Sequence, residues 1–228
     1  MIINFIKKIP GALWCADIFN SIIIIIKYSI GVNVETQDER ADPNDPEWVN
    51  NPWAIVFKKR SDYAKKYSID KDVLDLCCGT GWTTNEIGTV CKSVVGVDYS
   101  ERTIQSASNK YIDHKISFIK MNALSLKFPD KYFDTVVSME AIEHFTEDDG
   151  QKFISQAYRV LKKGGIFIGS TPETENQNPI KLRALRKIDP FHLFLYSKSM
   201  LESSLSRYFN NVQVIPQKEG WLLFIAEK

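Results

Sequence analysis

The stretch Val73-Leu74-Asp75-Leu76-Cys77-Cys78-Gly79-Thr80-Gly81 decides the fold, because it joins a short apolar run to a glycine loop. The apolar run is typical of a strand buried on both faces. Glycines at 79 and 81 let a ligand approach backbone N–H groups at the start of a following helix, where a side chain would block it. A lone G-x-G pair is weak evidence, so the stretch needs support from the rest of the chain.

Similar apolar runs recur along the chain, with helix-like segments between them. The expected strands cover residues 72–76, 93–98, 116–120, 133–139 and 165–170. The expected helices cover residues 54–67, 83–90, 100–111 and 148–161, and residues 211–216 and 221–226 form a hairpin. We therefore predict an α/β fold: a doubly wound, mostly parallel seven-stranded sheet with helices on both faces and a C-terminal antiparallel hairpin.

The helix expected at 148–161 is followed by Lys162-Lys163-Gly164-Gly165. Lysines in a final helical turn match the helix dipole, and a following glycine permits a left-handed cap. The sequence therefore predicts that this helix ends in a lysine-rich turn capped by glycine.

Composition bounds the class of protein. The chain has 228 residues, 44% hydrophobic and 25% charged, which suits one large globular domain. Lysine plus arginine (29) balance aspartate plus glutamate (28), so a net charge of +1 creates no field that would collect nucleic acid or anionic lipid. The four cysteines do not form a disulfide framework, which favours the reducing cytoplasm, and the absence of a C-x-x-C pair argues against structural zinc.

The first 52 residues differ from the rest. The run of isoleucines at 22–26 is interrupted nearby by Asp17, Asn20, Ser21 and Lys27, so no stretch reaches the roughly 18 to 20 apolar residues of a membrane span. We predict an apolar helical extension and polar linker at 1–52, before a catalytic domain at 53–228. Packing of the extension on the domain or a partner is the main interpretation, and shallow membrane contact is the alternative.

Two aspartates narrow the class of ligand that the loop is predicted to bind. Asp75 ends the strand before the loop, where a carboxylate would repel a pyrophosphate but suits a ligand with an ammonium and a sulfonium. Thr84 replaces the third glycine of the dinucleotide fingerprint, which disfavours NAD. Asp98 follows about 20 residues beyond the loop, where doubly wound nucleoside sites hold ribose hydroxyls. Tyr99 is then placed to stack on adenine, and Asn122 to accept from its exocyclic amine.

The chain resembles the class I S-adenosylmethionine-dependent methyltransferases in the order of five motifs: VLDLCCGTG, VVGVDYS, MNAL, FDTVVSMEAIEHF and VLKKGGIFI. The resemblance covers about residues 60–228 and is strongest to the branch with the ubiquinone-biosynthesis O-methyltransferases. It implies S-adenosyl-L-methionine as cofactor. Matching cofactor positions are Asp75, Gly79, Gly81, Asp98 and Asn122, and further implied contacts are Arg60, Cys77, Tyr99, Ala123 and Met139. Cys77 departs from the family's first loop glycine, and Asn122 from a more frequent aspartate.

A second group follows the fourth predicted strand. Glu140, Glu143 and His144 are spaced i, i+3, i+4, which puts them on one side of a helical turn as a metal site or base. The string resembles that of ubiquinone and small-RNA 2′-O-methyltransferases, where it binds a divalent cation, and His192 is the candidate fourth ligand. We expect Mg²⁺ or another divalent cation at Glu140, Glu143, His144 and His192, with the last three as catalytic residues. The alternative is a solvated first helical turn beside a buttressing histidine.

Three functions remain open from the sequence. The first is methylation of an oxygen on a small-molecule acceptor, with the segment 171–196 as acceptor wall. Arg183, Arg186 and Lys187 repeat there at helical spacing, which is typical of a solvated face and less often of a site for an acidic substrate. The second is RNA 2′-O-methylation, which the balanced charge disfavours. The third is a catalytically inert binding module that uses the apolar N-terminus. The acceptor and the oligomeric state are not specified.

Overall fold

The computed structural model of the chain describes residues 53–174 and 191–228, all within one compact unit. The predicted extension and linker at 1–52, and Arg183, Arg186 and Lys187 of the predicted acceptor wall, lie outside the described residues. No helix in the described ranges has the length and apolar character of a membrane span.

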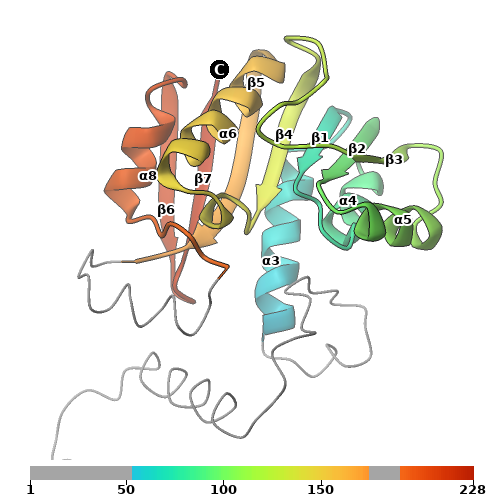
Figure 1. The fold of residues 1–228 in the computed structure, drawn as a ribbon, viewed down its shortest axis with the longest axis horizontal. Coiled ribbons are helices and arrows are strands. Elements are labelled where there is room, and N and C mark those ends of the chain that lie inside the picture. The colour runs from blue at the N-terminus through green and yellow to red at the C-terminus, as the bar shows by residue number, and fades with distance from the viewer. Residues whose placement is uncertain (1–52, 175–190) are drawn as a thin grey trace, which may run out of the picture. The chain divides into compact units, whose positions relative to one another are not determined.

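A seven-stranded sheet forms the centre of the domain, in the order β3-β2-β1-β4-β5-β7-β6 (Figure 1). The strands are β1 (Asp72–Leu76), β2 (Ser93–Asp98), β3 (Ile116–Lys120), β4 (Phe133–Met139), β5 (Leu161–Pro172), β6 (Asn211–Gln217) and β7 (Trp221–Glu227). Strands β1 to β5 pair in parallel, whereas β7 pairs antiparallel with both β5 and β6. The predicted fold class is confirmed, including the C-terminal hairpin.

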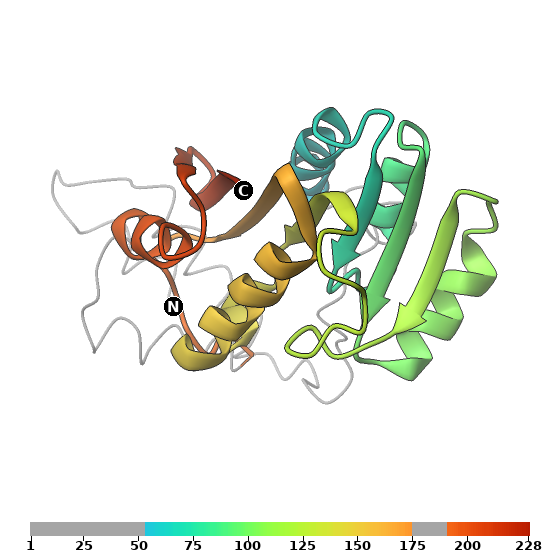
Figure 2. The same cartoon turned by 90° about the horizontal axis from the view of Figure 1, so that it is seen from above.

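Helices cover both faces of this sheet, and Figure 2 shows α3 and α6 on opposite sides of it. The described helices are α3 (Trp53–Lys66), α4 (Trp82–Gly88), α5 (Glu101–Lys110), the 3₁₀ turn η2 (Ile142–His144), α6 (Glu147–Val160) and α8 (Lys198–Leu205). Two cores result: one lies between the sheet, α6 and α8, and the other between the sheet, α3 and α4. The inner strands are thus mainly buried on both faces, as their uninterrupted apolar runs predict, whereas the edge strands β3 and β6 are largely exposed or half-buried.

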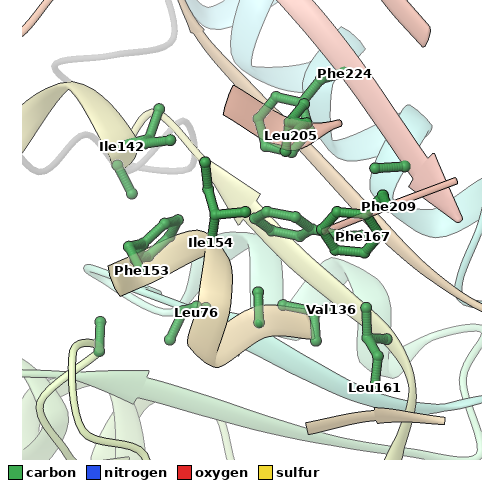
Figure 3. Packing of buried hydrophobic residues seen from close by; sticks show 14 of the residues in the cluster. Leu76, Val136, Ile142, Phe153, Ile154, Leu161, Phe167, Leu205, Phe209 and Phe224 are labelled. Carbon is green, nitrogen blue, oxygen red and sulfur yellow. The ribbon is translucent and has the colours of Figure 1, made fainter. Parts of the chain in front are cut away.

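The core on the α6 side is shown in Figure 3. Phe153 and Ile154 of α6 lie against Phe167 of β5, and all three side chains are fully buried. Burying a side chain of this size contributes about 2–3 kcal/mol. This packing fixes α6 on the sheet. It thereby also fixes the segment that connects the carboxyl end of β4 to the start of α6.

The predicted end of the last crossover helix is wrong. Helix α6 ends at Val160, and Leu161 already has extended backbone angles (φ −72°, ψ 139°) and begins β5. Leu161 is fully buried and pairs with Phe133, so apolar burial takes the chain into the sheet before the lysines. Lys162 and Lys163 belong to the strand, and Gly164 (φ 73°) lies within a register shift between β4 and β5 rather than in a helix cap.

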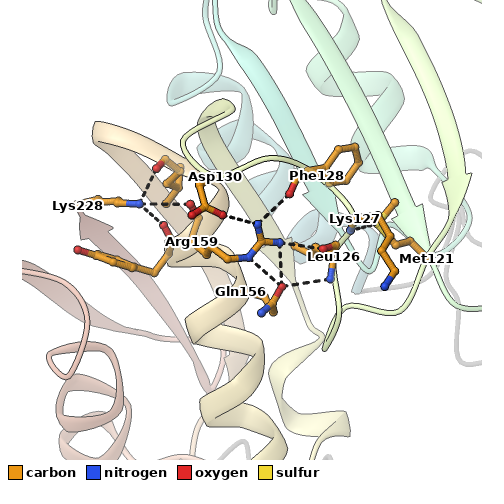
Figure 4. A network of polar contacts seen from close by, with 10 residues as sticks. Met121, Leu126, Lys127, Phe128, Asp130, Gln156, Arg159 and Lys228 are labelled. Atoms are coloured by element: carbon orange, nitrogen blue, oxygen red, sulfur yellow. Dashed lines mark hydrogen bonds and ion pairs between the residues drawn. The ribbon is translucent and has the colours of Figure 1, made fainter.

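A polar network ties the loop after β3 to α6 (Figure 4). The guanidinium of Arg159 donates to the carbonyl oxygens of Leu126 and Phe128, both at 2.8 Å, and pairs with Asp130 at 2.7 Å. Gln156 accepts from the N–H of Leu126 at 3.2 Å. One arginine therefore holds three points of the loop that carries the predicted adenine contacts.

We expect Arg159→Ala to lower the free energy of unfolding by about 2 kcal/mol, because two carbonyl groups lose a charged donor. Urea denaturation followed by circular dichroism measures the change. Lys152→Ala, on the same helix but in an exposed pair with Asp149, is the control and should change the stability much less. Equal losses in the two variants would show that the network adds nothing to the fold.

Candidate cofactor and acceptor site

The loop between β1 and α4 has a tight left-handed backbone. Cys77, Gly79 and Gly81 all have positive φ, at 65°, 52° and 79°. Gly81 is also required by packing, since a Cβ there would lie 2.7 Å from Cε1 of Phe118 on β3. The predicted strand–loop–helix unit is present, and its glycines are needed for the backbone conformation as well as for access by a ligand.

Cys77 has a left-handed backbone at the position where the resemblance implies a glycine. A residue with a Cβ is strained in this conformation by roughly 1–2 kcal/mol relative to glycine. Glycine recovers only a part of this difference, because it loses more conformational entropy on folding. We expect Cys77→Gly to raise the free energy of unfolding by about 1 kcal/mol. Cys77→Ala keeps the Cβ and should give no gain, so equal stabilisation by both substitutions would contradict the strain argument. Urea denaturation measures both.

Asp75 is buried at the end of β1. Its carboxyl is 2% exposed and accepts a hydrogen bond from Oγ1 of Thr84 at 2.6 Å. Burial raises the pKa of Asp75 to about 7, opposed by the Thr84 hydrogen bond. Burial thus works against the constant charge that we expected to face a cationic ligand, and the contact of Asp75 with that ligand stays a prediction. The physical reason is desolvation, which the motif does not reveal.

Asp98 connects the ends of two neighbouring strands. One carboxylate oxygen accepts from the N–H of Gly79 at 3.1 Å, and the other from the N–H of Ser100 at 2.9 Å. The side chain is 8% exposed. Ser100 in turn caps α5 by accepting from the N–H of Thr103. The glycine loop, the end of β2 and the start of α5 are thus held together through one aspartate.

The predicted adenine contacts lie at the same edge of the sheet, because β2 and β3 end side by side. Tyr99 is 74% exposed beyond β2, and Ala123 is buried beyond β3. The amide oxygen of Asn122 accepts from the N–H of Leu124 at 2.9 Å. That oxygen therefore closes a local turn, a role that the expected contact with adenine did not anticipate.

Arg60 reaches this edge from α3. Its Nη2 lies 2.9 Å from a carboxylate oxygen of Glu140, and its guanidinium stacks over the ring of Trp221 at 4.9 Å. Arg60 is 5% exposed, and Met139 is half-buried at the end of β4. Trp221 was not anticipated as part of the site, and its place at the start of an antiparallel strand offered no motif.

The predicted helical face of Glu140, Glu143 and His144 is wrong. Glu140 has a left-handed backbone (φ 52°), and its N–H donates to the carbonyl of Ser170. This bond continues the ladder between β4 and β5, so the 3₁₀ turn η2 starts only at Ile142. Ser170 also donates from its hydroxyl to Glu140 at 2.8 Å. Glu140 consequently faces Arg60 and Ser170.

Glu143, His144 and His192 do converge. One ligand atom from each lies within 4.8 Å of the others, and within the described ranges this group does not include Glu140. The imidazole rings are 5.3 Å apart, and Nδ1 of His144 lies 3.2 Å from the carbonyl oxygen of Phe191. A carboxylate and two imidazoles form a donor set that can bind a divalent cation or move a proton.

Glu143 is the centre of this group. It is fully buried, and Thr171 donates to its Oε2 at 2.9 Å, while Oε1 has no hydrogen-bond partner in the described structure. Burial, reinforced by the charge of Glu140, raises the pKa of Glu143 well above its usual range. The main-chain oxygen of Glu143 accepts from the N–H groups of Leu193 and Phe194, which brings His192 beside it. Ser170 and Thr171 were missed, although two hydroxyl residues ending a buried strand were a usable signal.

Comparisons with known proteins identify the family of the chain. The family model described as a methyltransferase domain matches residues 74–169. A probable S-adenosylmethionine-dependent methyltransferase of Mycolicibacterium smegmatis is 34% identical over 122 residues, 54% of this chain and 45% of that protein. The chain thus spans less than half the length of the first curated relatives it matches.

Other relatives match more of their own length. The PH0226 protein of Pyrococcus horikoshii has the same fold, with a TM-score of 0.66, 24% identity and coverage of 82% of this chain and 94% of that one. Demethylmenaquinone methyltransferase of a Geobacillus strain is 31% identical over 161 residues, covering 65% of this chain and 67% of that protein. This match and the domain at 74–169 show that the chain belongs to the S-adenosylmethionine-dependent methyltransferases.

Proposed function

We propose that this chain transfers a methyl group from S-adenosylmethionine to an oxygen of a small-molecule acceptor, as in the ubiquinone O-methyltransferase-like branch. The observation that carries the proposal is the convergence of Glu143, His144 and His192 after β4, the strand that pairs with β1 and so ends beside the start of the glycine loop. Relatives named for a tocopherol and a demethylmenaquinone support a small acceptor. The balanced charge disfavours the RNA alternative.

The residues of the chain have distinct tasks in this scheme. S-adenosylmethionine supplies a methyl group on a positively charged sulfur, and the reaction chiefly needs alignment of acceptor and sulfur. Asp98 and Tyr99 hold the nucleoside from β2, and Asn122 and Ala123 close the adenine end from β3. Since Nδ1 of His144 donates to the carbonyl of Phe191, the basic lone pair lies on Nε2. That nitrogen takes the proton from the acceptor hydroxyl.

A divalent cation fits the same group. Glu143, His144 and His192 would hold it, and the buried, unpartnered Oε1 of Glu143 is an acceptor that a cation would satisfy. Two imidazoles favour a transition metal such as Zn²⁺ or Fe²⁺ over Mg²⁺, which prefers oxygen ligands. Nε2 of His144 would then be a ligand and not the base, and the cation would instead lower the pKa of the acceptor hydroxyl.

The test combines binding with turnover. Calorimetry should show that the full chain binds S-adenosylhomocysteine, and mass spectrometry should show transfer to a hydroxyl of 3,4-dihydroxybenzoate, a probe with adjacent oxygens. His144→Ala should reduce turnover by about 100-fold or more, since a general base typically contributes about 100- to 10,000-fold. His114→Ala, which alters a histidine with an 86% exposed side chain, should leave it unchanged.

The outcomes separate the parts of the proposal. Failure to bind S-adenosylhomocysteine would refute cofactor use. Binding without transfer to any hydroxyl acceptor, together with equal behaviour of the two histidine variants, would favour the inert binding module. Retardation of RNA with a steep salt dependence would instead support the RNA methyltransferase. Chelation followed by addition of Zn²⁺, Fe²⁺ or Mg²⁺ tests the cation separately.

A further inference from the structure

The ion pair between Arg60 and Glu140 uses only part of the guanidinium. Nη2 of Arg60 contacts one carboxylate oxygen at 2.9 Å, whereas Nε is buried and has no hydrogen-bond partner in the described structure. The other carboxylate oxygen of Glu140 accepts from Ser170 at 2.8 Å. Glu140 is therefore shared between two donors and contacts only one nitrogen of the arginine edge formed by Nε and Nη2. A carboxylate that bound both nitrogens would form two parallel hydrogen bonds and would compete with Glu140 for Nη2.

The surroundings of Arg60 and Glu140 favour replacement of the Glu140 carboxylate by another carboxylate. The Arg60 side chain is 6% exposed and is stacked over the ring of Trp221, so the guanidinium stays in place whichever carboxylate it binds. Glu140 is 23% exposed and has a left-handed backbone, a conformation that is unfavourable for a residue with a Cβ. Glu140 is thus the more exposed member of the pair, and its backbone conformation is the less favourable one.

The ion pair between Arg60 and Glu140 lies where the amino-acid tail of the proposed cofactor is expected. The sheet order β3-β2-β1-β4 puts Asn122, Asp98, the glycine loop and Glu140 in a row along one edge. If adenine and ribose lie over β3 and β2, the amino-acid tail extends across the loop toward β4. Two strand spacings amount to about 10 Å, a distance that a ribose and an extended tail cover together. The tail ends in a carboxylate.

We propose that Glu140 is an internal competitor that occupies Arg60 until the carboxylate of the bound cofactor replaces it. The inference rests on the proposed use of S-adenosylmethionine and concerns what limits its affinity. Glu140 lowers the affinity for ligands that have a carboxylate, because Arg60 must give up one partner to take the other. A ligand with the same nucleoside and sulfur but no carboxylate leaves the pair intact.

The experiment compares two ligands by calorimetry on the full chain. S-adenosylhomocysteine has the carboxylate, and 5′-methylthioadenosine lacks the amino-acid tail. Glu140→Gln should bind S-adenosylhomocysteine about tenfold more tightly than the unaltered chain, the factor expected from removing one charged competitor. Its affinity for 5′-methylthioadenosine should be unchanged within about twofold. Glu202→Gln, which removes the same charge from an exposed pair with Lys198, should change neither affinity.

A second variant keeps the test independent of folding. Ser170→Ala removes the other hydrogen bond to Glu140 without altering its charge and should also tighten S-adenosylhomocysteine binding, by about two- to threefold. Thermal unfolding establishes that each variant is folded. Weaker or unchanged binding of S-adenosylhomocysteine by Glu140→Gln, or equal gains for both ligands, would overturn the competitor role alone. Absence of any binding to the unaltered chain would overturn the proposed cofactor as well.

Discussion

Replacing Asp98 with alanine is expected to weaken binding of S-adenosylhomocysteine by about 100-fold or more. Hydrogen bonds to a charged group contribute roughly 1.5–3 kcal/mol each, and the proposed contacts to two ribose hydroxyls would both be lost. The N–H groups of Gly79 and Ser100 would also lose their acceptor, which loosens the loop and the start of α5. Calorimetry with the full chain measures the affinity directly.

A matched control is available on the same part of the sheet. Asp113 also accepts a backbone hydrogen bond, from the N–H of Lys115 at 2.7 Å, but it precedes β3 and is remote from the glycine loop. Asp113→Ala should therefore retain the affinity of the unaltered chain. Asp98→Asn, which keeps one acceptor oxygen, should fall between the two. An Asp98→Ala variant that is folded and binds normally would show that the ribose is held elsewhere.

The second large effect is the pH dependence of the free energy of unfolding that Asp75 causes. The pKa of Asp75 rises from 3.8 to about 7 on folding, so the folded state binds its proton more tightly than the unfolded state does. The resulting stabilisation is fully present below pH 3.8 and is lost as the pH rises to about 7. A difference of about three pKa units corresponds to about 4 kcal/mol. Asp75→Asn cannot ionise and should escape this loss.

Urea denaturation of both proteins at several values between pH 4 and pH 8 tests this expectation. The stability of Asp75→Asn relative to the unaltered chain should increase by about 4 kcal/mol across the range. Asp72→Asn provides a contrast of opposite sign, because a hydrogen bond from Lys92 lowers the pKa of Asp72. Its stabilisation is present above pH 3.8 and lost in acid, so that variant should be the less stable protein at neutral pH. A constant difference between Asp75→Asn and the unaltered chain would refute the burial argument.

The strands were predictable because their physical signal is local. Four of the five parallel strands have the predicted bounds, since a strand buried on both faces is an uninterrupted apolar run between turn residues. The end of α6 was not predictable from the same signal. Leu161 could continue a helix or start a strand, and only its burial against β4 decides between them. Lysines and glycines that follow a helix are ambiguous for the same reason.

The sequence predicted where the site residues lie in the fold, but not which hydrogen-bond partners they have. Spacing placed Asp98 and His144 at the correct edge of the sheet, because strand ends set that position. The partners of Asp75, Glu140 and Asn122 depend on tertiary contacts with Thr84, Arg60 and a turn, which periodicity cannot show. His192 was identified only through resemblance, and it reaches Glu143 through main-chain bonds that leave no pattern in the sequence.

The proposed cofactor contacts of the sheet and the proposed acceptor contacts come from different segments of the chain. Residues 72–139, from β1 to the end of β4, form one uninterrupted stretch that contains the proposed nucleoside contacts of the sheet. The proposed acceptor side uses η2, the end of β5 and the segment around His192, which come from separate parts of the chain. A chimaera that exchanges residues 72–139 with a relative should keep its acceptor preference. Diversification of substrates can then proceed while residues 72–139 stay unaltered.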